Sequence, residues 1–399
     1  MQPSCSGGPV CTFDSSGNPA NCQLADRPFS FFFKEGEDDK VFVPACTGDV
    51  FWGSKDAQYP NVGFVDTDGT PYKLPGIDTD DITIHHRGFD NFLASLKWVG
   101  KRLGDKPHKV VVAGSSAGGY GAVTGFAFVK EVWPGADSYL IADAANGVIA
   151  SAFTATVINN PASPWGQQGN LPTWIPGIAQ LPGASNQFIP DFTATLANHY
   201  ARQSARDHRY GPVKVAQYTT EWDVDQAFYY GAMQNPPVYV DLFTVLLAGS
   251  LDPSSPTCAD QKTAYSGWHS LMDQYTGYLT HATARAGNYR YYRAAGYYHA
   301  ILTETPPFIL PDGTPVSFNP EGIFYNENSG GVPFNNWVRG MLGEPGQSWE
   351  NQQCSGQQCN QPDLRCYPIK NIRNWRGSAT KGTAWAASSS RTAAASPTI

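Results

Sequence analysis

The stretch Lys109-Val110-Val111-Val112-Ala113-Gly114-Ser115-Ser116-Ala117-Gly118 decides the fold expected for this chain. Its β-branched first half predicts a buried strand, and the apolar-periodic segment after it predicts a helix. Ser116 then stands at the apex of a sharp strand-to-helix turn, where small neighbours leave its Oγ exposed. The free N–H groups at the start of the helix point to the same place and can hold an oxyanion. The stretch therefore indicates a serine nucleophile, with Ala117 as an oxyanion donor.

The pattern Gly-x-Ser-x-Gly is weak by itself, because it is expected by chance roughly 0.3 times in a chain of this composition. Its context strengthens it. Gly119 and Gly121 extend the run of small residues, so the helix can pack close to the strand. The alternative interpretation is a glycine-rich helix start without chemistry.

Composition excludes several classes of protein. The 399 residues carry only 15% charged side chains and a net charge of −7, without a basic stripe that would indicate a nucleic-acid partner. The sequence contains no run of 18 apolar residues, so no membrane span is predicted. The Gly-x4-Gly-Lys-Ser/Thr phosphate loop is absent, and no cofactor is predicted.

Eight cysteines lie in loop-like segments near the two ends of the chain, and none forms a Cys-x2-Cys pair: Cys5, Cys11, Cys22, Cys46, Cys258, Cys354, Cys359 and Cys366. An even number of cysteines in loops predicts disulfides and an oxidising compartment, although reduced thiols are the alternative. Cys354, Cys359 and Cys366 are expected to pair with each other or with the earlier cysteines. No metal site is predicted, since the adjacent His85 and His86 would point to opposite faces of a strand.

The order of predicted elements indicates an α/β fold with a mostly parallel sheet and helices on both faces. Strands are expected at 40–44, 81–85, 109–113, 138–142 and 288–294, and helices at 89–103, 117–131 and 263–285. Residues 150–215 read as a cap or long loops, and 238–243 could be strand or helix. The expected organisation is a loop segment over 1–38, a catalytic domain over 39–345, a cysteine-containing segment over 346–376 and a disordered tail over 377–399.

A serine nucleophile needs a base and an acid that orients the base. In an α/β-hydrolase, the acid (Asp or Glu) follows the serine along the chain, and the histidine base comes last. His299, just beyond a late strand, is the expected base. His269 and His281, within the helix expected at 263–285, look like packing or solvated residues, and His199 and His208 look like surface residues. The residues alone leave several acids open: Asp143, Asp223, Asp225 and Asp252. The rate should then rise with pH around the ordinary histidine pKa of about 6.5.

Five motifs occur in an order that resembles the pectin acetylesterase family, which includes the Notum carboxylesterases. They are Cys46-Thr47-Gly48-Asp49-Val50 with Trp52-Gly53, His85-His86-Arg87-Gly88, Gly114-Ser115-Ser116-Ala117-Gly118-Gly119, Asp223-x-x-Gln226 and His299. They span about residues 40–305. The serine and Cys-Thr-Gly-Asp motifs are the more specific ones.

The resemblance implies an α/β-hydrolase-like fold and a Ser116–Asp223–His299 triad, with Asp225 as a surface neighbour and Gly48, Asp49 and Asp143 around the oxyanion hole and pocket. It also implies a serine carboxylesterase that removes acetyl groups from a polysaccharide such as pectin. Two alternatives are an esterase that acts on acylated protein or small esters, and a catalytically impaired binding protein.

One departure from the family concerns the oxyanion hole. Relatives carry an earlier strand that ends in a Gly-Gly-Gly-x-Cys segment, and no such segment is found here; Cys5-Ser6-Gly7-Gly8 is a poor match. We expect the chain to begin just past that element, which would also explain why no signal peptide precedes a protein expected to be secreted.

Overall fold

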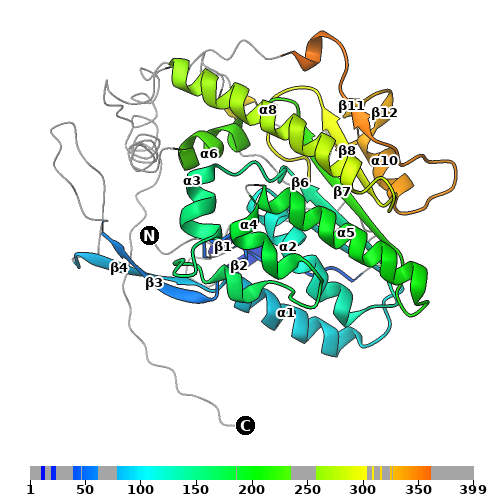
Figure 1. Ribbon diagram of the computed structural model, residues 1–399, viewed down its shortest axis with the longest axis horizontal. Coiled ribbons are helices and arrows are strands. Elements are labelled where there is room, and N and C mark those ends of the chain that lie inside the picture. The colour runs from blue at the N-terminus through cyan, green and yellow to red at the C-terminus, as the bar shows by residue number, and fades with distance from the viewer. Residues whose placement is uncertain are drawn as a thin grey trace.

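The computed structural model describes residues 39–45, 47–61, 79–185, 187–234, 258–302 and 327–360, with the short pieces 10–13, 19–23, 308–309, 315–316 and 324–325. Its centre is a five-stranded, all-parallel sheet of order β13-β8-β7-β6-β5 (Figure 1). The strands are β5 (Lys109–Ser115), β6 (Asp137–Asp143), β7 (Val213–Thr220), β8 (Tyr289–Ala294) and β13 (Gln352–Gln353). The α/β fold predicted from the sequence is therefore confirmed.

The register of the sheet brings the carboxyl ends of its strands to one edge. Ser115 at the end of β5 pairs with Asp143 at the end of β6, and Thr220 at the end of β7 pairs with Ala294 of β8. Segments that follow parallel strands therefore meet at this edge, which is where open α/β sheets place their ligand sites.

Helices cover both faces of the sheet because successive side chains of a strand point in opposite directions. The helices α2 (Ala117–Val132), α5 (Phe188–Arg206) and α8 (Cys258–Ala282) pack with Leu140 and Val215 on one face. On the other face, α10 (Phe334–Met341) packs against Ile141 and Tyr218. Figure 1 shows α5 between α2 and α8.

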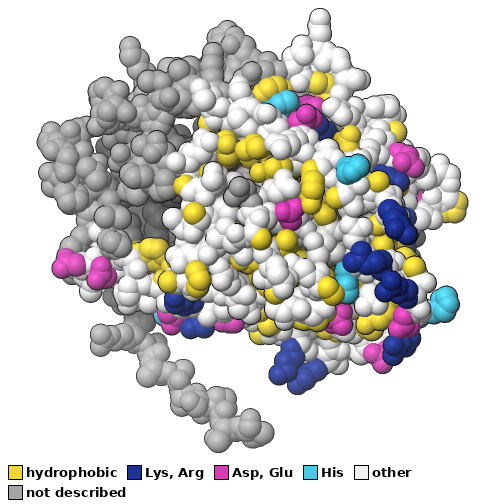
Figure 2. Space-filling model, viewed as in Figure 1, with side chains coloured by type: hydrophobic (Ala, Val, Ile, Leu, Met, Phe, Trp, Pro, Cys, Tyr) yellow, Lys and Arg dark blue, Asp and Glu magenta, His cyan; other side chains and the backbone are white. Residues whose placement is uncertain are grey.

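Helix α1 (Gly88–Leu103) lies outside α2 and contacts it through Val99, Val129 and Trp133. Charges complement the dipole of the surface helices: α5 has Asp191 in its first turn and Arg206 in its last. On the face drawn in Figure 2, Lys and Arg side chains gather at the right, around the end of α5.

Smaller elements surround this core. β3 (Lys55–Pro60) and β4 (Asp81–His86) form an antiparallel ribbon, and α6 (Val224–Gln234) follows β7 directly. The others are β1 (Val10–Phe13), β2 (Pro19–Gln23), α3 (Ser151–Phe153), α4 (Leu181–Ala184), β9 (Phe308–Ile309), β10 (Pro315–Val316), β11 (Asn328–Ser329) and β12 (Val332–Pro333). Short 3-10 or π turns lie at Thr154–Ile158, Gln167–Asn170, Ile178–Gln180 and Gln357–Cys359.

Several predicted elements differ from the structure. The strand expected at 40–44 is wrong: Val41 and Phe42 are about half exposed, so no burial compensates for ordering an extended segment there. Residues 150–215 are not loops throughout, because they contain α5 and the start of β7. The segment 1–38, expected to be loop, contains the paired strands β1 and β2. Residues 238–243 and 377–399 lie outside the described residues.

Lys130, on α2, is a buried cation at the amino-terminal edge of the sheet. Its ammonium donates to the carbonyl oxygens of Ala136 and Gly211 and to the hydroxyl of Ser138, at 2.7, 2.9 and 3.2 Å. Burial lowers the pKa of Lys130 to about 8, although Asp137 and Glu131 oppose the shift. The side chain thus ties α2 to the starts of β6 and β7.

We expect Lys130→Met to lower the free energy of unfolding by about 1–3 kcal/mol, because the buried oxygens lose their donor. Urea denaturation measures the change. The exposed Lys97 provides the control, and Lys97→Met should leave stability within about 0.5 kcal/mol of the parent. Equal stabilities of the two variants would contradict the role given to Lys130.

Candidate active site

Ser116 lies between the end of β5 and the start of α2, in a strained backbone conformation. Its φ of 55° and ψ of −122° are rare for a residue with a side chain. Its N–H donates to the carbonyl oxygen of Asp143 at 2.8 Å, which anchors the turn to β6. Strain of this kind persists only where the surroundings impose it, and it concentrates at functional sites.

The glycines beside Ser116 are required by close backbone contacts. A Cβ on Gly114 would lie 2.0 Å from the carbonyl oxygen of Gly118. A Cβ on Gly119 would lie 2.6 Å from the Cβ of Ala145 and 2.9 Å from the carbonyl oxygen of Asp143. The small-residue pattern therefore has a steric cause, because any larger residue would push α2 away from the sheet.

His299 and Asp223 are in direct contact. The Nδ1 atom of His299 lies 2.9 and 3.0 Å from the two carboxylate oxygens of Asp223, which is fully buried. The backbone N–H groups of Asp225 and Gln226 also donate to Asp223, at 3.1 and 2.9 Å, so this carboxylate caps the start of α6. A buried carboxylate at a helix N-terminus is well placed to orient an imidazole.

Gln226 is a site residue to which sequence reasoning gave no role, although it belongs to a quoted motif. Its Nε2 group donates to Asp223 at 2.9 Å and lies 3.2 Å from both Asn146 Oδ1 and Thr219 Oγ1. Its Oε1 atom accepts the backbone N–H of Asn146 at 3.1 Å. Gln226 therefore holds the second oxygen of Asp223, and its spacing of three residues from Asp223 is the signal that could have identified it.

Asp143, predicted as a pocket residue, links the serine turn to the histidine segment. Its carboxylate accepts the hydroxyl of Ser115 at 2.5 Å and the N–H groups of Ile301 and Leu302 at 3.0 and 2.8 Å. Burial raises the pKa of Asp143 to about 6, against the lowering effect of these donors and of His299. One carboxylate therefore binds Ser115, next to Ser116, and Ile301, two residues after His299.

The loop that contains Gly48 and Asp49 packs on the first turns of α2. Asp49 is buried and accepts the hydroxyl of Thr47 at 2.7 Å and the N–H of Gly88 at 2.9 Å. A Cβ on Gly121 would lie 2.6 Å from the ring of Phe51, so the loop touches the helix closely. The carboxylate of Asp49 organises this loop; an oxyanion role for Gly48 and Asp49 stays a prediction.

The backbone of the same loop is unusual. Gly48, Val50 and Phe51 have positive φ values of 63°, 48° and 66°, and for the β-branched Val50 this is a marked outlier. The indole of Trp52 donates to the carbonyl oxygen of Tyr120 at 3.4 Å. A second strained segment therefore lies against the helix that starts at Ser116.

The expectation for one acidic residue is wrong, and another acidic residue lies outside the part of the chain that the structure describes. Asp225 is half-buried rather than a surface neighbour, and burial raises its pKa while His299 lowers it and Asp223 raises it. Asp252 lies outside the described residues. Among the candidate acids that the structure describes, Asp223 is the one that contacts Nδ1 of His299.

The pKa of His299 differs from the expected value. Burial lowers this pKa, but the charge and hydrogen bond of Asp223 and the charges of Asp225 and Asp143 outweigh burial. The net effect raises the pKa of His299 to about 9. The expectation of about 6.5 is therefore wrong, because it assumed an unperturbed imidazole.

The expectation that His199 lies at the surface is wrong, because this residue is buried on α5, where its ring packs against Tyr200. Three further histidines have structural partners. His85 is exposed and pairs with Asp56, whereas His86 is buried and contacts Tyr59, so the two point to opposite faces as expected. His269 stacks on Trp222, with ring centroids 4.0 Å apart.

In the described ranges, no three His, Cys, Asp or Glu side chains gather as a metal site would require. No described helix is both long and apolar enough to cross a membrane.

Compared with known proteins, the chain matches no protein-family model and no curated protein. The resemblance to the pectin acetylesterase family therefore rests on the quoted motifs alone. The contact between Ser116 Oγ and His299 expected from that resemblance stays a prediction.

The strain at Ser116 has a measurable consequence for stability. Glycine adopts positive φ without a steric penalty, whereas alanine does not. We expect Ser116→Gly to be about 1 kcal/mol more stable than Ser116→Ala, although glycine is ordinarily the less stabilising of the two. Urea denaturation of both variants measures the difference. A Ser116→Ala protein as stable as Ser116→Gly would mean that the turn is not strained.

Proposed function

We propose that this protein is a serine carboxylesterase with Ser116 as nucleophile, His299 as base and Asp223 as the orienting acid. The observation that carries the proposal is the bidentate contact of His299 with buried Asp223, at the sheet edge where the strained turn of Ser116 also lies. A serine, an acid and a histidine, which follow β5, β7 and β8, supply the groups that acyl transfer needs.

In the proposed reaction, the Oγ atom of Ser116 attacks the carbonyl carbon of the ester while His299 accepts the hydroxyl proton. The N–H of Ala117, in the first turn of α2, faces the developing oxyanion, because the first N–H groups of a helix have no partner within it. His299 then protonates the leaving alcohol, and an acyl group remains on Ser116. Water, deprotonated by His299, hydrolyses this acyl-enzyme and releases the acid.

We propose an α/β-hydrolase-like arrangement for the domain. Three features support it: the parallel sheet, the Gly-x-Ser-x-Gly turn after β5, and the order Ser116, Asp223, His299 along the chain. The motif resemblance supports acetyl groups on a polysaccharide as the substrate. The disulfide between Cys354 and Cys359 supports a site of action outside the cell, since such bonds persist in oxidising compartments.

Ser116→Ala should abolish hydrolysis of an aryl acetate and labelling by a fluorophosphonate probe, because both need the serine oxygen. His299→Ala should lower kcat nearly as much, since the two residues act as a unit. Ser95, half-buried in the middle of α1 and bonded to the carbonyl oxygen of Asn91 in its own helix, provides the matched control as Ser95→Ala. Unchanged activity of Ser116→Ala would reject Ser116 as the nucleophile, and a parent protein with neither activity nor probe labelling would favour the binding-protein alternative.

Acetate release from a panel of acetylated polysaccharides separates the acetylesterase from an esterase that acts on other esters. Release from a polysaccharide at a higher kcat/KM than from an aryl acetate would support the polysaccharide. Activity confined to small esters or to acylated peptides would be consistent with the proposed triad but would reject a polysaccharide as the substrate.

The pH dependence follows from the surroundings of His299. The imidazole must be neutral to accept the proton of Ser116, so kcat/KM should rise with pH to a midpoint near pH 9, the pKa of His299. Asp223→Asn should move the midpoint down toward about 6.5 and lower kcat by orders of magnitude. A midpoint near 6.5 in the unmodified protein would contradict the acidic environment assigned to His299.

A further inference from the structure

Trp222 directly precedes Asp223, and its side chain leaves the acid segment toward the carboxyl-terminal part of the chain. It is 9% exposed. Its indole N–H donates to the carbonyl oxygen of Cys359 at 2.9 Å, and its ring stacks on His269 with an interplanar angle of 7°. Its backbone N–H donates to Gly296 at 3.0 Å, three residues before His299. Trp222 therefore contacts both segments whose alignment the proposed reaction needs.

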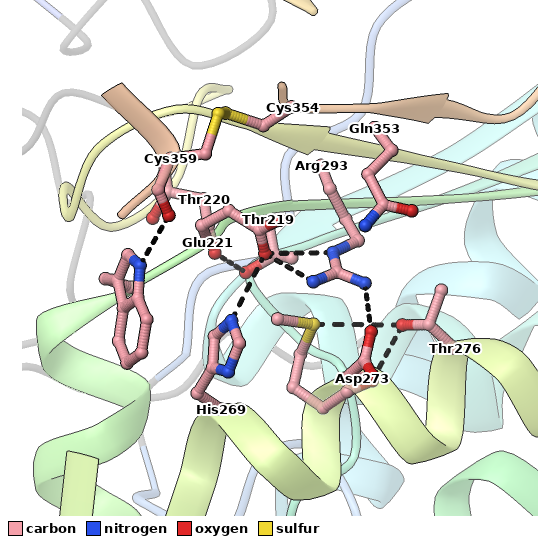
Figure 3. Close-up of polar contacts among 12 residues, drawn as sticks. Thr219, Thr220, Glu221, His269, Asp273, Thr276, Arg293, Gln353, Cys354 and Cys359 are labelled. Atoms are coloured by element: carbon pink, nitrogen blue, oxygen red, sulfur yellow. Dashed lines mark hydrogen bonds and ion pairs between the residues drawn. A yellow bond between two sulfur atoms is a disulfide. The ribbon is translucent and has the colours of Figure 1, made fainter. Parts of the chain in front are cut away.

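The acceptor for the indole belongs to a loop closed by a disulfide. Cys354 and Cys359 are joined, and the N–H of Cys354 donates to the carbonyl oxygen of Arg293 on β8 at 3.0 Å. The hydrogen bond to Arg293 attaches the start of the loop, at Cys354, to β8. The disulfide attaches the end of the loop, at Cys359, to the same cysteine (Figure 3). Without the disulfide, the six-residue loop 354–359 and its turn hydrogen bond from Cys359 to Gly356 would have to position the carbonyl of Cys359.

A buried ion pair holds the residue before Trp222. Arg293 donates to one oxygen of Glu221 through Nε and Nη2, at 3.0 and 2.5 Å, and to Asp273 through Nη1 at 2.6 Å. Figure 3 shows His269 from α8 directed at the same carboxylate, 3.6 Å away. Since Arg293 and Glu221 are both nearly inaccessible, this end of the segment is rigid.

The two anchors differ in what they constrain. The ion pair fixes Glu221, at the end of the sheet, whereas the indole contact is the last side-chain anchor before Asp223. Loss of the indole contact would let the peptide between Trp222 and Asp223 rotate, although the cap of α6 and the amide of Gln226 would still donate to the two carboxylate oxygens. The alignment of Asp223 with the imidazole is therefore the property at risk.

We propose that Trp222, held by the disulfide-closed loop 354–359, is a positioning residue that keeps Asp223 aligned with His299. It acts through Asp223 and touches no reacting atom. This inference rests on the proposed esterase function for its kinetic consequences, but not for its effect on the imidazole itself.

Trp222→Phe tests the proposal, because phenylalanine keeps a ring to stack on His269 and removes the N–H donor. We expect kcat on an aryl acetate to fall about threefold to tenfold at unchanged KM, as the loss of one buried hydrogen bond allows. The pKa of His299, which faces Asp223, Asp225 and Asp143, should fall measurably below its parent value. Imidazole titration by NMR, assigned with a His299→Gln spectrum, measures it without reference to activity.

The disulfide provides an independent arm. Cys354→Ser with Cys359→Ser should lower kcat and the pKa of His299 as Trp222→Phe does, and the three changes together should add little more, because they break one contact. Trp337→Phe is the matched control. Its indole donates to the carbonyl oxygen of Glu350 at 2.6 Å, so the same bond is lost far along the chain from Asp223. This control should lower stability only.

The outcomes separate the two proposals. Parent values of kcat and of the His299 pKa in Trp222→Phe, with a stability loss like that of Trp337→Phe, would overturn the positioning role. A lowered His299 pKa in a protein that shows no Ser116-dependent activity would support the positioning role and reject the esterase. Additive losses from Trp222→Phe and the two cysteine changes would overturn the link through the loop.

Discussion

The buried carboxylate of Asp143 accepts hydrogen bonds from both the turn that carries Ser116 and the segment that carries His299. No other feature of the described site joins these two segments so directly. The carboxylate is available because β6 lies between β5 and β7 in the sheet and ends level with the serine turn. Since the group is fully buried, any loss of its donors would leave a costly unpaired acid, so the two segments hold each other in place.

The parallel sheet makes this convergence possible. Segments after β5, β6, β7 and β8 are 184 residues apart at their extremes, from Ser115 to His299, yet meet at one edge because every strand runs the same way. Each segment then uses a different local device to hold its side chain. The serine turn relies on glycine contacts, the acid relies on the cap of α6, and the histidine segment relies on Asp143 and on Thr220, whose hydroxyl donates to Tyr298.

The sequence predicted β5, β6 and β8 of the central sheet, but it predicted neither β7, the middle strand, nor β13. The valine-rich strand before Ser116 has a strong local signal, and the structure has it where expected. Helix α5 was missed because its apolar face is interrupted by polar residues and preceded by a proline-rich stretch, so it forms mainly by packing against α2 and α8. The role of Gln226 and the basicity of His299 depend on partners 80 and 76 residues distant in the chain, which no local pattern records.

The charges around His299 affect the proposed reaction in two opposing ways. With a pKa raised to about 9, most of the imidazole is protonated at pH 7, which reduces the fraction of molecules ready to accept a proton. The same carboxylates stabilise the imidazolium that forms once Ser116 has lost its proton, so they favour the charge distribution of the transition state. The first effect vanishes above pH 9, whereas the second persists while Asp223 stays ionised. In the proposed reaction, Asp223, Asp225 and Asp143 would therefore stabilise the charged intermediate more than they prepare the resting base, and they would favour turnover in alkaline surroundings.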